Sequence, residues 1–386
     1  MTSLTVKQCG LGLLLALCLG GPALAEAPPE LAPLYGRLEQ QGLGNAVLNQ
    51  MEIGIRSYEL GRRDLAAAAF DSALTQIETI YANNENAAKA RSLWYDEGRK
   101  DFKGEPYERV MAYFYRGLLY LEEKDYGNAR ASFEGGMLQD AFAEEEQHRF
   151  DFALMAFMSG WASHLEKNDV MQGRAFEELK KLRADFTLPD PVHDTLVIVE
   201  TGTAPRKLAD GVGHYELVYR RGKFFTEQRV QLAVNGQNAV AYPMEDIFWQ
   251  ATSRGGRAVD RIIKGKASFR NTNAGMGTVL TETSGVLQVF SGGDSALGGV
   301  VAGLGILGAA QLFVASKVQA KADTRSWTGL SDAVHVYTLK AKPGQKAALT
   351  FTDKAGTPLP DLSRTIDLPA KGGLVWVRAR NAPPVN

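Results

Sequence analysis

The N-terminal half of the chain repeats one pattern of small and aromatic residues at helical spacing. In residues 51–74 and again in residues 108–139, a glycine is followed twelve residues later by an alanine and four residues after that by a phenylalanine. These residues are Gly54, Ala66 and Phe70 in the first stretch and Gly117, Ala129 and Phe133 in the second. A glycine opposite an alanine lets two helices approach closely, and the phenylalanine fills the space beside them. Each stretch is therefore predicted to form two antiparallel helices joined by a tight turn.

A third helix pair is expected from the apolar pattern of residues 152–165 and 173–186. Two prolines, Pro189 and Pro191, follow this pair and are predicted to end the helical half near Phe186. Three stacked pairs are about the minimum for a stable helical solenoid.

From Asp194 onward the pattern changes to short runs of β-branched and aromatic residues separated by turn signals. The turn signals include Asn235-Gly236, Pro343-Gly344 and Gly372-Gly373. The strand-like runs are residues 196–202, 215–222, 230–237, 267–273, 335–356 and 373–380. These runs predict a β-rich part, either a sandwich or a partly open barrel. The expected fold class is α+β, with a helical solenoid over residues 26–188 and a β-rich domain over residues 189–386.

One apolar segment interrupts the β-rich part. Residues 296–315 carry no formal charge and are long enough to cross a bilayer as a helix, and Gly299 and Gly303 form a G-x-x-x-G pair suited to close helix packing. A transmembrane helix here would put the strands before and after it on opposite sides of a membrane. We therefore favour a Gly-rich helix buried against the rest of the protein, or held in a membrane-active or oligomeric state; a membrane-spanning helix is the alternative.

The first 25 residues have the pattern of a secretory signal peptide, with one positive charge at Lys7, an apolar run and cleavage expected before Glu26. Cys9 and Cys18 both lie inside it, so no cysteine is expected in the mature chain. Acylation at Cys18 is the alternative, although Leu17 stands where lipoprotein signals place a small residue. The predicted location is the periplasm, with or without association to the outer membrane.

Composition narrows the functional classes. The 386 residues exceed the usual size of one core, and apolar residues at 45% with charged residues at 23% are ordinary for a folded protein. A formal net charge of −1 gives no argument for a nucleic-acid partner or a strongly acidic membrane surface. The five histidines lack metal-ligand spacing, and no serine stands in a G-x-S-x-G motif. We therefore predict no catalytic residues, no metal site, no cofactor and no enzymatic activity.

Two sets of residues are candidates for binding. The first lines the expected groove of the helical half around Arg109, Tyr113, Arg116 and Tyr120, where a protein segment would bind. Glu105, Glu108 and Arg99 could extend it as a charged site, but the simpler interpretation is that Pro106 opens a helix and Glu108 interacts with the helix dipole.

The second set belongs to a basic segment, residues 247–266, with a short helix expected after Gly256. Arg254, Arg257 and Arg261 would bind an anionic glycan, a lipid headgroup or a protein surface; the alternative is an exposed charged helix. Gly265-Lys266 lacks the flanking residues of a phosphate-binding loop, which excludes that type of nucleotide site.

Four stretches together carry a resemblance to a known group: residues 104–109 (GEPYER), 117–133, 250–257 (QATSRGGR) and 322–327 (ADTRSW). In these the chain resembles an uncharacterised family of bacterial envelope tetratricopeptide-repeat proteins. Many members are predicted lipoproteins, and some are encoded near outer-membrane lipoproteins that activate peptidoglycan synthases. The resemblance implies an envelope scaffold or adaptor that binds a protein partner, linked to envelope or peptidoglycan assembly, and it assigns no catalytic residues. The alternative is a membrane-inserting or oligomer-forming structural protein acting through residues 296–315.

Overall fold

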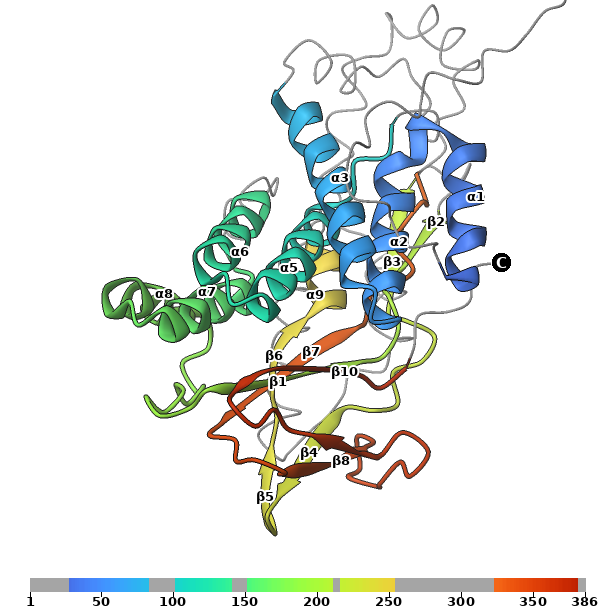
Figure 1. Cartoon of the computed structure of the whole chain (residues 1–386). Coiled ribbons are helices and arrows are strands. Elements are labelled where there is room, and N and C mark those ends of the chain that lie inside the picture. The colour runs from blue at the N-terminus through green and yellow to red at the C-terminus, as the bar shows by residue number, and fades with distance from the viewer. Residues whose placement is uncertain (1–27, 83–100, 141–150, 211–215, 254–322, 381–386) are drawn as a thin grey trace, which may run out of the picture.

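The computed structural model describes residues 28–82, 101–140, 151–210, 216–253 and 323–380 (Figure 1). Helices occupy its N-terminal half and sheets its C-terminal part, which confirms the α+β class. Across these described ranges, no helix has the length and apolar character needed to cross a membrane. The predicted signal peptide with Cys18, the arginines at 254, 257 and 261, and the apolar segment 296–315 lie outside the described residues.

The helical half consists mainly of helix pairs joined by short turns (Figure 1). It begins with a 3-10 turn η1 (Pro29–Leu31), helix α1 (Ala32–Gln41) and a second turn η2 (Leu43–Asn45). The pairs are α2 (Ala46–Glu59) with α3 (Arg63–Ala82), α5 (Pro106–Glu122) with α6 (Tyr126–Asp140), and α7 (Ala153–Glu166) with α8 (Asp169–Leu182). All three pairs expected from the sequence are therefore present as helices.

A glycine and a phenylalanine set the close approach in each pair. A methyl group built on Gly117 would lie 2.3 Å from the ring of Phe133, and one built on Gly54 would lie 2.8 Å from the ring of Phe70. The third pair uses the same device, since Gly160 would place a methyl group 2.3 Å from the ring of Phe176. The interval from glycine to phenylalanine is sixteen residues in all three pairs. The third pair was predicted from its apolar pattern alone, because Gln172 stands where the first two pairs have alanine and the full glycine-alanine-phenylalanine spacing is absent.

The C-terminal part contains two four-stranded sheets and a hairpin. The first sheet has the strand order β10 (Gly373–Arg378), β1 (Thr195–Thr201), β7 (Ala333–Leu339), β6 (Tyr242–Asp246). The second sheet has the order β5 (Gln237–Val240), β4 (Arg229–Val234), β8 (Lys346–Thr352), β9 (Arg364–Asp367). Strands β2 (Arg206–Asp210) and β3 (Glu216–Arg220) form the hairpin, and helix α9 (Ile247–Ser253) follows β6 directly. Strand β1 runs parallel to β10 and antiparallel to β7.

The first sheet is the middle layer between the helices and the second sheet (Figure 1). Successive side chains of a strand point to opposite faces. Along β1, Leu196 and Ile198 accordingly pack into a core shared with the helices, whereas Val197 and Val199 pack against the second sheet. The helical half and one face of the first sheet therefore share one hydrophobic core, and the two sheets enclose a second core between them.

Candidate partner-binding site

The four predicted groove residues lie along one side of helix α5, and we call them the α5 stripe: Arg109, Tyr113, Arg116 and Tyr120. The guanidinium of Arg116 donates two hydrogen bonds to Asp71 of α3, with Nε–Oδ1 at 2.7 Å and Nη2–Oδ2 at 3.2 Å. The same guanidinium lies over the ring of Tyr120, 3.7 Å from its centroid. Arg116 is thus fixed between an acid on the neighbouring pair and an aromatic ring on its own helix.

Tyr113 crosses the space between helices α6 and α3. Its ring lies against Gly135 of α6, where a methyl group would come within 2.9 Å of it, and its hydroxyl donates to Oε1 of Glu78 on α3 at 2.7 Å. Burial, and then the hydrogen bond to Glu78, raise the pKa of Tyr113 well above its usual range. The hydroxyl therefore stays protonated at neutral pH and remains a donor.

Arg109 has an internal role. Its Nε donates to Oε1 of Gln139 on α6 at 2.9 Å, and its Nη1 donates to the carbonyl of Gly104 at 2.6 Å. Arg109, Tyr113 and Arg116 are buried, and Tyr120 is half-buried. The α5 stripe is therefore a row of fixed groups whose accessible part is Tyr120, together with the exposed acids Asp71 and Glu78.

The charged loop before α5 has the simpler of its two expected roles. Glu105 caps the helix, Pro106 occupies its first turn, and the backbone N–H of Glu105 donates to Oε2 of Glu108 at 2.7 Å, so the two acids form a capping box. Glu105 also forms an ion pair with Lys207 of β2, with Nζ–Oε1 at 2.5 Å. Arg99 lies outside the described residues.

The opposite side of α5 faces the chain's own β-rich part. Tyr115 donates its hydroxyl hydrogen bond to Glu200 of β1, with O–Oε1 at 2.9 Å. Residues 323–332, which we call the return segment, lie against α2 and α5 just before β7. Trp327 of this segment is fully buried beside Tyr115, with ring centroids 5.7 Å apart. A partner has no free surface there, because the chain fills it.

Two buried carboxylates hold the return segment. Oε1 of Glu108 accepts a hydrogen bond from the backbone N–H of Trp327 at 2.6 Å, and Oε1 of Glu52 accepts from the N–H and the hydroxyl of Thr328, both at 2.7 Å. Burial raises the pKa of Glu108 to about 7, with Lys207 opposing the shift, and burial also raises the pKa of Glu52. The raised pKa values of these two acids thus belong to groups that hold the return segment in place.

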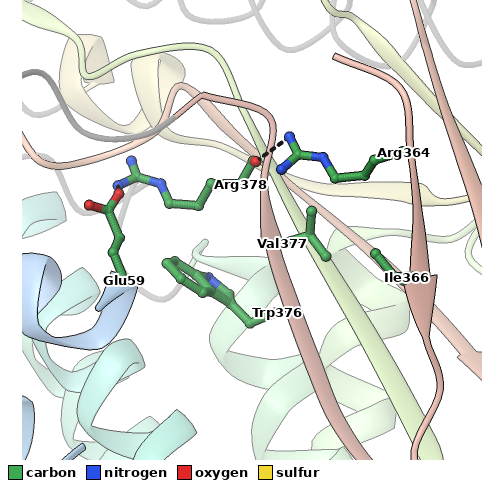
Figure 2. Close-up of a pocket in the computed structure, with 6 residues that line it drawn as sticks. All are labelled: Glu59, Arg364, Ile366, Trp376, Val377 and Arg378. Atoms are coloured by element: carbon green, nitrogen blue, oxygen red, sulfur yellow. Dashed lines mark hydrogen bonds and ion pairs between the residues drawn. The ribbon is translucent and has the colours of Figure 1, made fainter. Parts of the chain in front are cut away.

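A small pocket lies where an edge of each sheet meets the end of α2 (Figure 2). It has a volume of about 220 Å³ and is lined by Glu59, Arg364, Ile366, Trp376, Val377 and Arg378. Sequence reasoning did not single out any of these residues, because α2 lies more than three hundred positions before the neighbouring strands β9 and β10 that complete the pocket.

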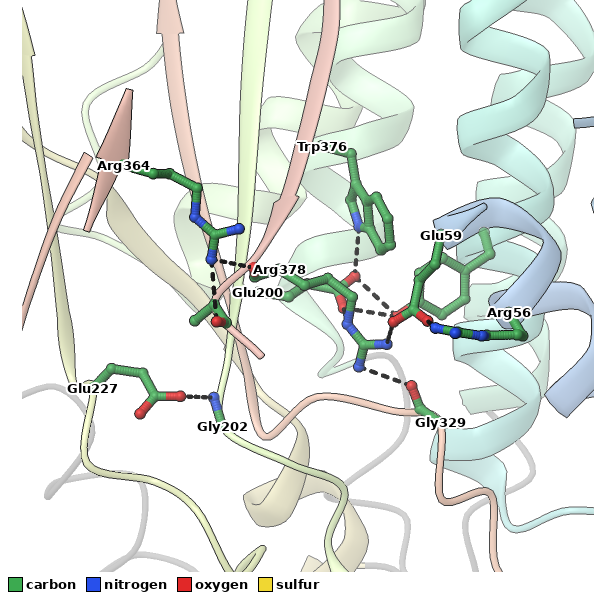
Figure 3. A network of polar contacts seen from close by, with 11 residues as sticks. Arg56, Glu59, Glu200, Gly202, Glu227, Gly329, Arg364, Trp376 and Arg378 are labelled. Atoms are coloured by element: carbon green, nitrogen blue, oxygen red, sulfur yellow. Dashed lines mark hydrogen bonds and ion pairs between the residues drawn. The ribbon is translucent and has the colours of Figure 1, made fainter. Parts of the chain in front are cut away.

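Behind the pocket, a buried ion network joins α2, β1, β10 and the return segment (Figure 3). Arg378 forms ion pairs with Glu59, at 2.6 Å between Nη1 and Oε1, and with Glu200, at 3.2 Å between Nε and Oε2. It also donates to the carbonyl of Gly329 at 2.8 Å, and the indole N–H of Trp376 donates to Glu200 at 2.9 Å. Burial raises the pKa of Glu200, and Arg378 opposes that shift.

No family model matches this chain, and no curated protein or solved structure matches it significantly. Among the residues that the structure describes, no group of three or more histidine, cysteine, aspartate or glutamate side chains could hold a metal ion. A function therefore has to be inferred from the described contacts and from the sequence pattern.

Proposed function

We propose that this protein is a non-catalytic scaffold or adaptor of the bacterial cell envelope, which binds a protein partner along the α5 stripe of a tetratricopeptide-like helical solenoid. One observation carries the proposal: the chain's own sheet and return segment cover one side of α5, while on the stripe side Tyr120 remains accessible and stacks on Arg116, which Asp71 holds in place.

Side chains that are already fixed favour binding, because ordering flexible side chains at an interface reduces the binding affinity. Aromatic residues and arginine are also the residue types that dominate the energetics of protein interfaces. Arg116 is held by Asp71 and stacked on Tyr120, so neither side chain needs to be ordered by the partner. The Asp71 side chain is 55% exposed, which leaves an acid at the rim for a basic group of the partner.

The envelope address comes from the sequence. The leader up to residue 25 and the resemblance to envelope repeat proteins support export, and the same resemblance supports a link to envelope or peptidoglycan assembly. Both are part of the proposal.

Quantitative capture of partners tests the proposal. The full-length mature protein is immobilised, incubated with a native envelope extract, and compared with Tyr120→Ala and Glu78→Lys variants. Glu177→Lys, the same charge reversal at an exposed position of α8, is the matched control. We expect a discrete partner whose capture falls about fivefold or more in the Tyr120→Ala and Glu78→Lys variants, equivalent to about 1 kcal/mol, and stays unchanged in the control. Equal capture by all four proteins would remove the α5 stripe as the binding site.

A further inference from the structure

We propose that the pocket between the two sheet edges binds the C-terminal carboxylate of a partner polypeptide whose last residue is apolar. We call it the seam pocket (Figure 2). The inference goes beyond the proposed function, because the seam pocket shares no residue with the α5 stripe and can be tested by itself.

The pocket carries a positive charge, that of Arg364, which no carboxylate of the described residues matches. Arg364 of β9 donates only to backbone carbonyls: from Nε to Leu362 at 3.3 Å, and from Nη2 to Arg378 at 2.7 Å and Ala379 at 3.1 Å. Within the described part of the chain, no carboxylate lies at ion-pair distance from its guanidinium, and desolvation by burial lowers the pKa of Arg364. The residue as a whole remains exposed, so its guanidinium can be reached from solvent, and a carboxylate is the group that an arginine fork pairs with best.

The other charges of the pocket are already matched. Glu59 accepts from Arg378 at 2.6 Å and from Arg56 at 2.9 Å, so its carboxylate is neutralised within the network of Figure 3. Arg378 is neutralised in turn by Glu59 and Glu200. The surplus positive charge of the seam pocket is therefore that of Arg364.

The size and the lining of the pocket also favour the end of a peptide chain. Ile366, Val377 and Trp376 supply apolar walls, and Trp376 is held edge-on by Tyr58 with ring centroids 4.7 Å apart. The volume of about 220 Å³ is below the roughly 300–1,000 Å³ of pockets that enclose a drug-sized ligand. It suits the end of a chain with a small apolar side chain.

The pocket lies between two edge strands. Strand β10 is an outer strand of the first sheet, and β9 is an outer strand of the second. An extended peptide binds readily beside an exposed sheet edge, where main-chain hydrogen bonds add affinity and the capture of a terminal carboxylate adds specificity. Arg364 donates to the carbonyl of Arg378, the last residue of β10, and to that of Ala379, so its guanidinium lies where an incoming chain would terminate.

Titration with a matched pair of small probes tests the inference on the full protein. N-acetylvalylvaline with a free carboxylate is compared with the same dipeptide as its C-terminal amide. Binding is followed by the indole N–H resonance of Trp376 in protein labelled with nitrogen-15 at tryptophan, assigned with a Trp376→Phe variant. We expect the acid to bind with a Kd below about 1 mM and the amide to bind at least tenfold more weakly.

Variants locate the charge that is responsible. Arg364→Gln is expected to weaken binding of the acid at least tenfold, and Arg364→Lys, which keeps the charge but loses the fork, is expected to have an intermediate effect. Lys371→Gln removes an exposed positive charge that does not line the pocket and is expected to leave the Kd unchanged within twofold. Equal binding of acid and amide, unaltered binding by Arg364→Gln, or no shift of the Trp376 resonance with 5 mM of the acid would each overturn the inference.

Discussion

The contact between Gly117 and Phe133 gives a sharp test of how the helix pairs are built. Gly117→Ala would place a methyl group 2.3, 2.6 and 2.8 Å from three atoms of the Phe133 ring, distances that real methyl groups essentially never show. The ring is fully buried. Either the ring or helix α5 has to move.

Two effects of opposite sign determine how much Gly117→Ala changes the free energy of unfolding. Alanine is favoured over glycine inside a helix by about 1 kcal/mol, whereas overpacking a well-packed core costs about 1–3 kcal/mol. Because three ring atoms are too close at once, we place the overpacking near the upper end of that range. The expected net loss in the free energy of unfolding is about 1–2 kcal/mol.

Urea unfolding followed by circular dichroism measures this loss as a lower midpoint at unchanged slope. Gly173→Ala in α8 is the control, since a methyl group there would meet nothing within 4 Å. That variant is expected to gain about 0.5–1 kcal/mol from helix propensity alone. Adding Phe133→Leu to Gly117→Ala should relieve part of the loss, and the coupling energy measures the contact. A Gly117→Ala variant as stable as the parent protein would refute the close-approach reasoning.

Three further predictions concern the buried groups that join the two halves. Trp327→Ala should lower the free energy of unfolding by about 3–5 kcal/mol, measured in urea, because a fully buried indole leaves a cavity; a loss below 1 kcal/mol would show that the return segment is not held against α5. Arg378→Ala should lower the free energy of unfolding by about 3–5 kcal/mol, because it leaves the buried Glu200 without its ion-pair partner. Adding Glu200→Gln should recover more of this stability than adding Glu59→Gln, since Glu59 keeps its ion pair with Arg56, and equal recovery would contradict this order. Burial raises the pKa of Glu245 from 4.5 to about 7 in the folded protein, where its neighbours are Arg183, Gln250 and Asp151. The folded state therefore binds the proton more tightly than the unfolded state. The free energy of unfolding should fall as pH rises from about 4.5 to about 7 and then level off. Glu245→Gln should flatten that part of the curve of unfolding free energy against pH, and a curve parallel to that of the parent protein would argue against the shift.

Local patterns predicted much of the fold. The spacing of glycine, alanine and phenylalanine predicted the first two helix pairs, the apolar pattern predicted the third, and alternating apolar runs coincide with β1, β3, β4, β7, β8 and β10. The short strands β2, β5, β6 and β9 were missed, because they are polar or contain a proline and gain their stability from the neighbouring strand. The helix expected after Gly256 and the strand-like run 267–273 lie outside the described residues, and helix α9, which ends at Ser253, was not expected.

The arrangement of the halves could not be predicted from local patterns. The pairing of β1 with β10 joins residues 195 and 373, and the contact of Arg378 with Glu59 spans 319 positions. Neither leaves a local signal in one sequence. The α5 stripe was predicted as a set, but its partners Asp71 and Glu78 were not, because the stripe faces a neighbouring pair whose orientation depends on packing.

The most direct test of the α5 stripe is photo-crosslinking in living cells. p-Benzoylphenylalanine is introduced in place of Tyr120 and, as the control, in place of Phe224, which is 54% exposed in the β-rich part. Cells producing each protein from its natural locus are irradiated, and the adducts are identified by mass spectrometry. The scaffold proposal predicts a discrete adduct to one envelope protein from position 120 and none to the same protein from position 224. The same adduct from both positions, or no adduct from position 120, would contradict it.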